Sequence, residues 1–290
     1  MLNMPFEQTQ KIEQEAKKPE KDLDVGLERG VEKLEHFLEL MAENLRKEGV
    51  PVDNECRVDM NAFREVYSKE VLNNDNQELE RLEAGWRDEK SLSKEEYIKE
   101  RKGGIGERME MLKTAIFHKN LSPDFIVART SHFDDVKRGM DNIILEKETG
   151  NVVCAFDEVA DVSSSRYREK RNKVLKRNLA KEGPTLKYGL KIEEENGKMT
   201  LGLGDIKDVP IFYLAISPWL IEEGIRNFRP QAKEQFDYEK RLFDEFILSL
   251  NEQIAFLKSS KVKRLPVRTQ NGILLFEESL KRFTPEKEKK

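Results

Sequence analysis

The sequence predicts a mixed α+β fold, in which a helical N-terminal part and a long C-terminal helix accompany a central mixed β-sheet flanked by helices. Apolar residues recur at helical spacing over 24–120 and again over 236–257. Residues 125–128, 139–145 and 152–158 are instead rich in β-branched and apolar residues, which is typical of strands. Apolar and charged residues each make up 37% of the chain, so much of it must be solvated surface.

The helical part is expected to consist of several helices joined by short breaks. The first should end at Gly49, and Asp59 is placed to cap a second one. The stretch 77–102 is highly charged with sparse apolar positions, which indicates an extended helical arm. Three glycines within 103–106 interrupt it, and a short helix over 107–119 follows.

The second half is expected to alternate strands and helices. Residues 163–181 read as a helix with a thin apolar face. Residues 185–192 alternate apolar and polar, and Asn196-Gly197 is a strong signal for a tight hairpin turn back into 199–203. The nearly continuous apolar run 209–216 is typical of a central strand buried on both faces.

These patterns divide the chain into four parts. Residues 1–22 and 285–290 are polar and predict disordered tails. Residues 23–104 form the helical region, and residues 105–284 form an α/β core with C-terminal helices.

Composition favours a cytoplasmic protein. The start of the chain has no apolar signal segment, and no run reaches the length of a membrane span, so no membrane partner is expected. The two cysteines, Cys56 and Cys154, form no paired motif, which suggests a reducing compartment. The net charge of −4 gives no overall attraction to nucleic acid, so such binding would need a local patch.

The most informative feature is a set of acids in the hairpin made by 139–145 and 152–158. In one register Asp141 lies opposite Asp157, and in a register one residue longer it lies opposite Glu158. Asp134 and Asp135 precede the hairpin and are expected to join from a loop. Acids in apolar strands require an Arg or Lys, a shared proton or a divalent cation to offset their charge.

Two interpretations of these acids remain open. Mg²⁺ prefers a few carboxylates with water, so Asp141, Asp157 and Asp135 are the candidate metal ligands. Alternatively, the acids pair with Arg129, Arg138 or lysines at a sheet edge.

The helix predicted after the hairpin is strongly basic. Between residues 163 and 181 the only acid is Glu169. The cations that recur at helical spacing on one face, a pattern that suits a phosphate backbone, are Arg166, Lys170, Lys173 and Arg177.

The element order over 105–217, together with two acids, resembles the PD-(D/E)XK nuclease-like superfamily. The segment Gly139-Met140-Asp141 corresponds to the acid of the second strand, and Phe156-Asp157-Glu158-Val159 stands where the (D/E)XK element belongs. Val159 occupies the position of the motif lysine, which is a departure from the pattern. Some members of the superfamily carry this lysine on the following helix, and others have lost activity.

The resemblance implies roles for particular residues. Asp141 and Asp157, with Glu158, would form the metal-dependent catalytic set, and Lys170 or Lys173 would replace the motif lysine in orienting the attacking water. The acid often found on the first helix of the superfamily would be Glu107 or Glu110.

The sequence thus predicts a Mg²⁺-dependent nuclease-like protein that binds or cleaves nucleic acid phosphodiesters. The alternative is a non-catalytic intracellular module that binds a protein partner through its charged helices. The chain contains no phosphate-binding loop of the GxxxxGK[ST] type, no HExxH pair and no CxxC pair.

Overall fold

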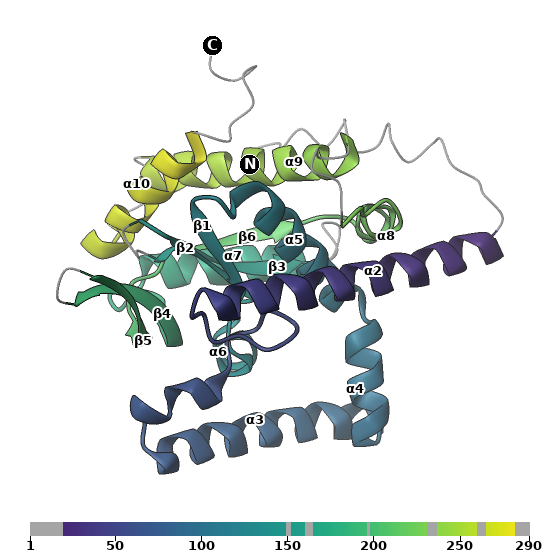
Figure 1. Ribbon diagram of the computed structural model, residues 1–290, viewed down its shortest axis with the longest axis horizontal. Coiled ribbons are helices and arrows are strands. Elements are labelled where there is room, and N and C mark those ends of the chain that lie inside the picture. Colours follow the sequence, from purple (N-terminus) through teal and green to yellow (C-terminus); the bar gives the residue numbers. More distant parts are fainter. Residues whose placement is uncertain are drawn as a thin grey trace.

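The computed structural model confirms the α+β class (Figure 1). It describes residues 20–148, 152–159, 165–195, 198–230, 237–259 and 265–281. The predicted tails and the Asn196-Gly197 turn lie outside these residues. The elements, in chain order, are α2 (Glu20–Lys47), the 3₁₀ helix η1 (Met60–Glu65), α3 (Lys69–Lys90), α4 (Lys94–Gly103), α5 (Ile105–Leu121), β1 (Phe125–Arg129), α6 (His132–Arg138), β2 (Asn142–Glu146), β3 (Val152–Val159), α7 (Ser165–Leu179), β4 (Leu186–Glu195), β5 (Lys198–Ile206), β6 (Ile211–Ala215), α8 (Pro218–Arg226), α9 (Asp237–Lys258) and α10 (Val267–Lys281).

The central sheet has four strands in the order β1-β2-β3-β6, and β4 and β5 form a separate hairpin. The first three strands are antiparallel neighbours, and β6 pairs with β3 in parallel. Asn142 pairs with Phe156, which is the shorter of the two registers expected for the hairpin, and a bulge follows at Ile144 and Leu145. Asp141 therefore lies one position before β2, beside Asp157.

Helices cover both faces of this sheet. The ring of Phe156 stacks on Phe117 of α5 at a centroid distance of 5.4 Å and meets Phe276 of α10 edge-on. Successive strand residues point to opposite faces. Asp157 accordingly turns the other way, where Lys170 of α7 meets it. Helices α5 and α7 thus lie on opposite faces and flank the same end of β3.

Strand β6 is not the central strand that its apolar run predicts, because it occupies an edge of the sheet. Helices nevertheless bury most of its side chains. Side-chain amides bind the backbone groups on the edge of β6 that has no neighbouring strand. Asn178 of α7 accepts from the backbone N–H of Ile211 and donates to its carbonyl oxygen, at 3.0 and 2.7 Å. Gln253 of α9 does the same at Tyr213, at 3.0 and 2.8 Å. These contacts satisfy an edge that would otherwise pair with another chain.

At the opposite edge of the sheet, main chain pairs with the last residue of β1. The segment Cys56–Val58 runs parallel to the end of β1. Arg129 N–H donates to the Cys56 carbonyl at 2.8 Å, and Val58 N–H donates to the Arg129 carbonyl at 3.1 Å. The loop after α2 is thereby fixed beside the C-terminal end of β1.

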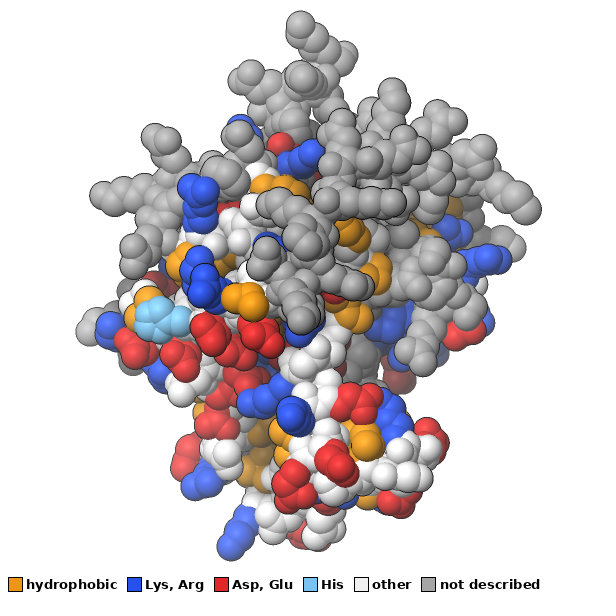
Figure 2. Space-filling model, turned by 90° about the vertical axis from the view of Figure 1, so that its right-hand side faces the viewer, with side chains coloured by type: hydrophobic (Ala, Val, Ile, Leu, Met, Phe, Trp, Pro, Cys, Tyr) orange, Lys and Arg blue, Asp and Glu red, His pale blue; other side chains and the backbone are white. Residues whose placement is uncertain are grey.

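The charged region folds as two helices, not as one arm. Helix α3 ends at Ser91, whose φ is 55°, and a capping box between Ser93 and Glu96 starts α4. Figure 1 shows α3 passing below the sheet and α4 returning toward it. In Figure 2 the lower part of the molecule, where α3 lies, shows acidic and basic side chains interspersed. The helix expected after Asp59 is also interrupted, because Asp59 caps only η1 and Ser68 caps α3.

A short helix, α6, stands where a loop was expected. The Ser131 side chain caps its first turn, and Gly139 ends it with a φ of 55°, in the left-handed region that favours glycine. Asp134 and Asp135 therefore lie in a first helical turn, where negative charge is favourable.

Helix α2 packs on the core through a close approach to α8. Its buried side chains include Leu34, Leu38 and Met41. A Cβ built at Gly30 would lie 2.5 Å from the carbonyl oxygen of Ile225, so only glycine fits there. Among the helices described, none is both long and apolar enough to cross a membrane.

We expect Gly30→Ala to destabilise the protein by about 1–3 kcal/mol, because the added methyl must push α2 away from α8. Gly26 lies in the same helix and has no atom within 4 Å of the position that an added methyl would occupy, so it is the matched control. Gly26→Ala should stabilise by about 0.5–1 kcal/mol through helix propensity alone. Urea unfolding measures the change in the free energy of unfolding for each variant. Equal changes for Gly30→Ala and Gly26→Ala would contradict the close packing of α2 on α8.

Candidate metal centre

Three carboxylates converge at one end of the central sheet. They belong to Glu110 of α5, Asp135 of α6 and Asp141 just before β2, and one oxygen from each lies within 4.8 Å of the others. Asp141 is buried, with an exposed fraction of 6%, and the other two are partly buried. Asp135 and Asp141 are two of the three ligands predicted from the sequence, and Glu110 is one of the two candidates for the first-helix acid.

Backbone pairing fixes Asp141 at this position. Its N–H donates to the Phe156 carbonyl at 2.7 Å, and its carbonyl accepts from Thr130 N–H at 3.0 Å. Asp141 is thus tied to both neighbouring strands although it precedes β2. These bonds fix the position from which the side chain of Asp141 extends into the cluster.

The charge of Asp141 is strongly disfavoured. Burial raises its pKa well above the ordinary value, and the nearby charges of Glu110, Asp135 and Asp157 raise it further. Lys170 acts in the opposite direction and does not cancel the shift. A site that penalises a carboxylate in this way is favourable for a bound cation or a retained proton.

Asp157 adjoins the three carboxylates but is not one of the group whose oxygens lie within 4.8 Å. Its exposed fraction is 1%. Oδ1 forms an ion pair with Lys170 Nζ at 2.7 Å, and among the described residues neither Oδ1 nor Oδ2 has a partner in hydrogen-bond geometry. Burial lowers the pKa of Lys170, but Asp157 and Asp141 more than offset this effect and raise it overall.

Other α7 cations reach the same corner. A Cβ at Gly139 would lie 3.3 Å from Lys173 Nζ, 3.5 Å from Asp157 Oδ2 and 3.9 Å from Arg177 Nη1. Arg177 also donates to the Gly139 carbonyl at 3.3 Å. Three of the four cations predicted to share a face of this helix, namely Lys170, Lys173 and Arg177, are thus next to Asp157.

Two predicted site residues have no described side chain. Glu158 lies in β3, where it pairs with Leu214, and Arg166 lies in the first turn of α7, but the side chains of both are outside the described residues.

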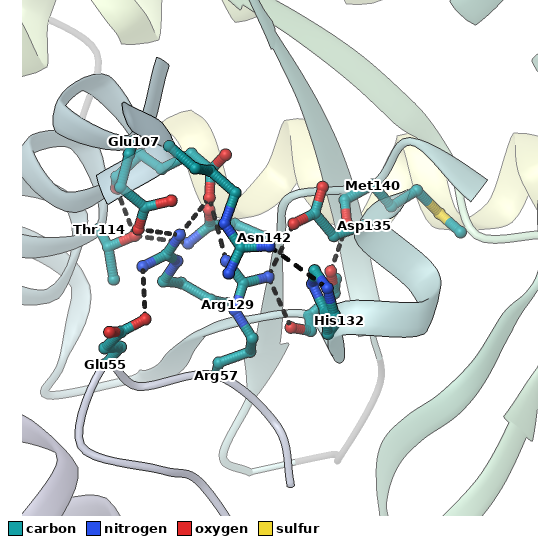
Figure 3. A network of polar contacts seen from close by, with 12 residues as sticks. Glu55, Arg57, Glu107, Thr114, Arg129, His132, Asp135, Met140 and Asn142 are labelled. Carbon is teal, nitrogen blue, oxygen red and sulfur yellow. Dashed lines mark hydrogen bonds and ion pairs between the residues drawn. The ribbon is translucent and has the colours of Figure 1, made fainter. Parts of the chain in front are cut away.

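Arginines already bind part of the acidic cluster (Figure 3). Arg129 is fully buried, and its Nη2 pairs with Glu107 at 2.6 Å and with Glu110. Arg57 Nη1 lies 2.9 Å from Asp135 Oδ2, and its Nη2 lies 3.5 Å from Glu110 Oε2. The predicted alternative, in which Arg129, Arg138 or lysines neutralise the acids, is seen for Asp157 with Lys170 and for Asp134 with Arg138. Asp135 is instead neutralised by Arg57, which the alternative did not include.

Asp134 has a structural position instead. Its carboxylate accepts from the backbone N–H groups of Lys187 and Tyr188, at 2.8 and 2.9 Å, and from the Ser131 hydroxyl. Arg138, on the next turn, lies 3.4 Å from it. Asp134 anchors the β4–β5 hairpin to α6, and it is not one of the three carboxylates that converge at the candidate metal centre.

A buried lysine lies beneath the centre. Lys113 of α5 has no exposed surface, and its Nζ donates to Asn142 Oδ1 at 2.8 Å. Asn142 in turn donates to the Thr114 hydroxyl at 2.7 Å. Burial lowers the pKa of Lys113 to about 7, against the opposing effect of Asp141 and Glu110.

Comparison with models of known protein families, with curated proteins and with solved structures gives no match to this chain. Sequence reasoning missed Arg57, which meets Asp135 across 78 residues, and no local pattern marks it. Lys113 follows Glu110 at helical spacing, so a search for charged pairs on α5 would have found it.

We expect one aspartate to keep its proton well above the ordinary range, because burial and three like charges disfavour its ionised form. A ¹³C NMR titration of the carboxyl groups measures this directly. Asp141→Asn should remove the late-titrating resonance, and Asp88→Asn, which alters an exposed acid on α3, should leave it in place. An Asp141 resonance that titrates near pH 4 would contradict the charge crowding.

Proposed function

We propose that this chain is a metal-dependent nuclease-like protein that acts on nucleic acid phosphodiesters. The observation that carries the proposal is the convergence of Glu110, Asp135 and Asp141 beside Asp157 and the basic side of α7. Carboxylates that favour a divalent cation, next to cations that favour phosphate, are the two components of a metal-assisted route to phosphodiester hydrolysis.

The donors present suit a hard divalent cation such as Mg²⁺. The candidate ligands are Glu110, Asp135 and Asp141, and the buried Oδ2 of Asp157 offers a further acceptor. When bound, such an ion would lower the pKa of a coordinated water and stabilise charge on a phosphoryl oxygen.

The surrounding residues have distinct roles in this proposal. Lys170 lies beside Asp157. It would take the role of the motif lysine, whose position in the sequence is occupied by Val159. Lys173 and Arg177 bind the phosphate backbone from the same side. The elements α5, β1, β2, β3, α7 and β6 follow one another in the order that the resemblance to PD-(D/E)XK nucleases implies, and this supports the proposal. Helix α6 is inserted between β1 and β2, and the β4–β5 hairpin is inserted between α7 and β6.

The second candidate function is a non-catalytic module that binds a protein partner. Its support is the pairing of Glu110 and Asp135 with Arg57 and Arg129, which offsets charge without any metal. The charged helices α3 and α4 would then present the binding surface. This module would be a relative of the nucleases that has lost the metal.

A reducing compartment, such as the cytoplasm, fits the cysteines. Cys56 and Cys154 are both buried free thiols. Burial raises the pKa of the Cys56 thiol to about 12, so it stays protonated and unreactive.

The test of the metal centre is calorimetric titration with Mn²⁺ or Mg²⁺. The wild-type chain should bind one ion, and Asp141→Asn should weaken binding by at least about tenfold because it removes one charged ligand. Binding should also tighten as pH rises through the raised pKa of Asp141, since the metal must displace its proton.

The matched control is Asp88→Asn, which removes one exposed carboxylate from α3 and should leave the affinity unchanged. Absence of Mn²⁺ and Mg²⁺ binding by a folded wild-type chain would contradict the nuclease proposal and favour the interaction module.

Nucleic acid binding should depend on the α7 cations. Removing one lysine–phosphate interaction lowers the slope of log affinity against log salt by about 0.9 for duplex DNA and about 0.7 for single strands. Lys173→Ala should therefore reduce the slope by the amount of one such interaction, whereas Lys99→Ala, on α4, should not. Salt-dependent fluorescence anisotropy with both substrates measures this. Equal effects of the two variants would exclude α7 as the binding surface.

A further inference from the structure

The side chain of Arg57 enters the candidate metal centre from a loop outside the nuclease-like core. Asp53 Oδ1 accepts from the backbone N–H groups of Glu55 and Arg57, at 2.9 Å each. The Cys56 thiol donates to the Leu38 carbonyl at 3.1 Å. With the pairing of Cys56–Val58 to the end of β1, these bonds hold the backbone at Arg57 in one place.

The guanidinium of Arg57 bridges two of the three candidate ligands. Nη1 lies 2.9 Å from Asp135 Oδ2, and Nη2 lies 3.5 Å from Glu110 Oε2. This is the only ion pair of Asp135 in the described part of the chain. A carboxylate oxygen that receives a guanidinium N–H presents less of its lone-pair density to a metal, and a cation at that distance repels another one.

Arg129 differs from Arg57 in its burial and in its partners. It is fully buried, and it also pairs with Glu107, which is outside the three-carboxylate group. Arg129 therefore has a partner outside the three-carboxylate group, whereas no ion pair of Arg57 among the described residues lies outside it. The Arg57 side chain keeps 11% of its surface exposed, so it has a route out of the cluster.

We propose that Arg57 is a built-in competitor of the metal, which occupies the carboxylates of Asp135 and Glu110 and must withdraw before a divalent cation binds all three. This regulation rests on the proposed metal centre. It sets the metal concentration at which the site fills, and it links filling of the site to the loop after α2.

The test compares Mn²⁺ affinity in the full chain by calorimetry. Arg57→Gln keeps hydrogen-bond donors but removes the charge, and it should bind Mn²⁺ about tenfold more tightly, the size that one partly buried ion pair carries. The matched control is Arg226→Gln. Arg226 bridges Glu222 and Glu223 on α8 with 16% of its side chain exposed, and its loss should leave the affinity unchanged.

The outcomes separate this inference from the proposed function. Equal or weaker Mn²⁺ binding by Arg57→Gln, with normal binding by the wild-type chain, overturns the competition and leaves the metal centre intact. Absence of binding by both chains overturns the metal centre itself, and the competition with it.

A measurement on the wild-type chain covers the case in which Arg57→Gln does not fold. Mg²⁺ should shift the Nε–H resonance of Arg57 in ¹⁵N NMR spectra and leave that of Arg226 in place. An Arg57 resonance that is unchanged in the Mg²⁺-bound chain overturns the inference.

Discussion

The burial of Asp141 among like charges is the constraint on which the rest of the site depends. Main-chain bonds to β1 and β3 hold this residue at the sheet end, so its carboxylate stays near Glu110, Asp135 and Asp157. Such crowding costs stability, and a fold retains it only where something offsets the charge. The guanidinium groups of Arg57 and Arg129 and the α7 cations all serve this purpose, and none of them reaches every acid.

The fold places this cluster by bringing four elements to one corner. Helices α5 and α7 lie on opposite faces of the sheet, α6 closes its lower end, and β2 and β3 supply the acids between them. Both sheet edges have partners near this corner: the amides of Asn178 and Gln253 bind the backbone of β6, and the segment Cys56–Val58 pairs with Arg129 at the end of β1.

Local patterns predicted the hairpin and left two registers open, of which the structure has the shorter one up to the bulge. They also predicted a shared face for the α7 cations, of which Lys170, Lys173 and Arg177 lie near Asp157. The edge position of β6 was not predictable from the sequence. An apolar run indicates a buried strand, but it does not show whether a second strand or the side chains of helices lie along its edge. Helix α6 has seven residues, too few for a periodic signal. Arg57 was missed because its contacts to Glu110 and Asp135 span 53 and 78 residues, and only the folded chain brings them together.

We propose that Glu110, Asp135 and Asp141 form a site for a divalent cation. Anomalous scattering from a crystal of the chain grown with Mn²⁺ tests it most directly. We predict an anomalous peak between Glu110, Asp135 and Asp141. A crystal that contains Mn²⁺ but shows no peak there, with Arg57 still paired to Asp135, would contradict the claim.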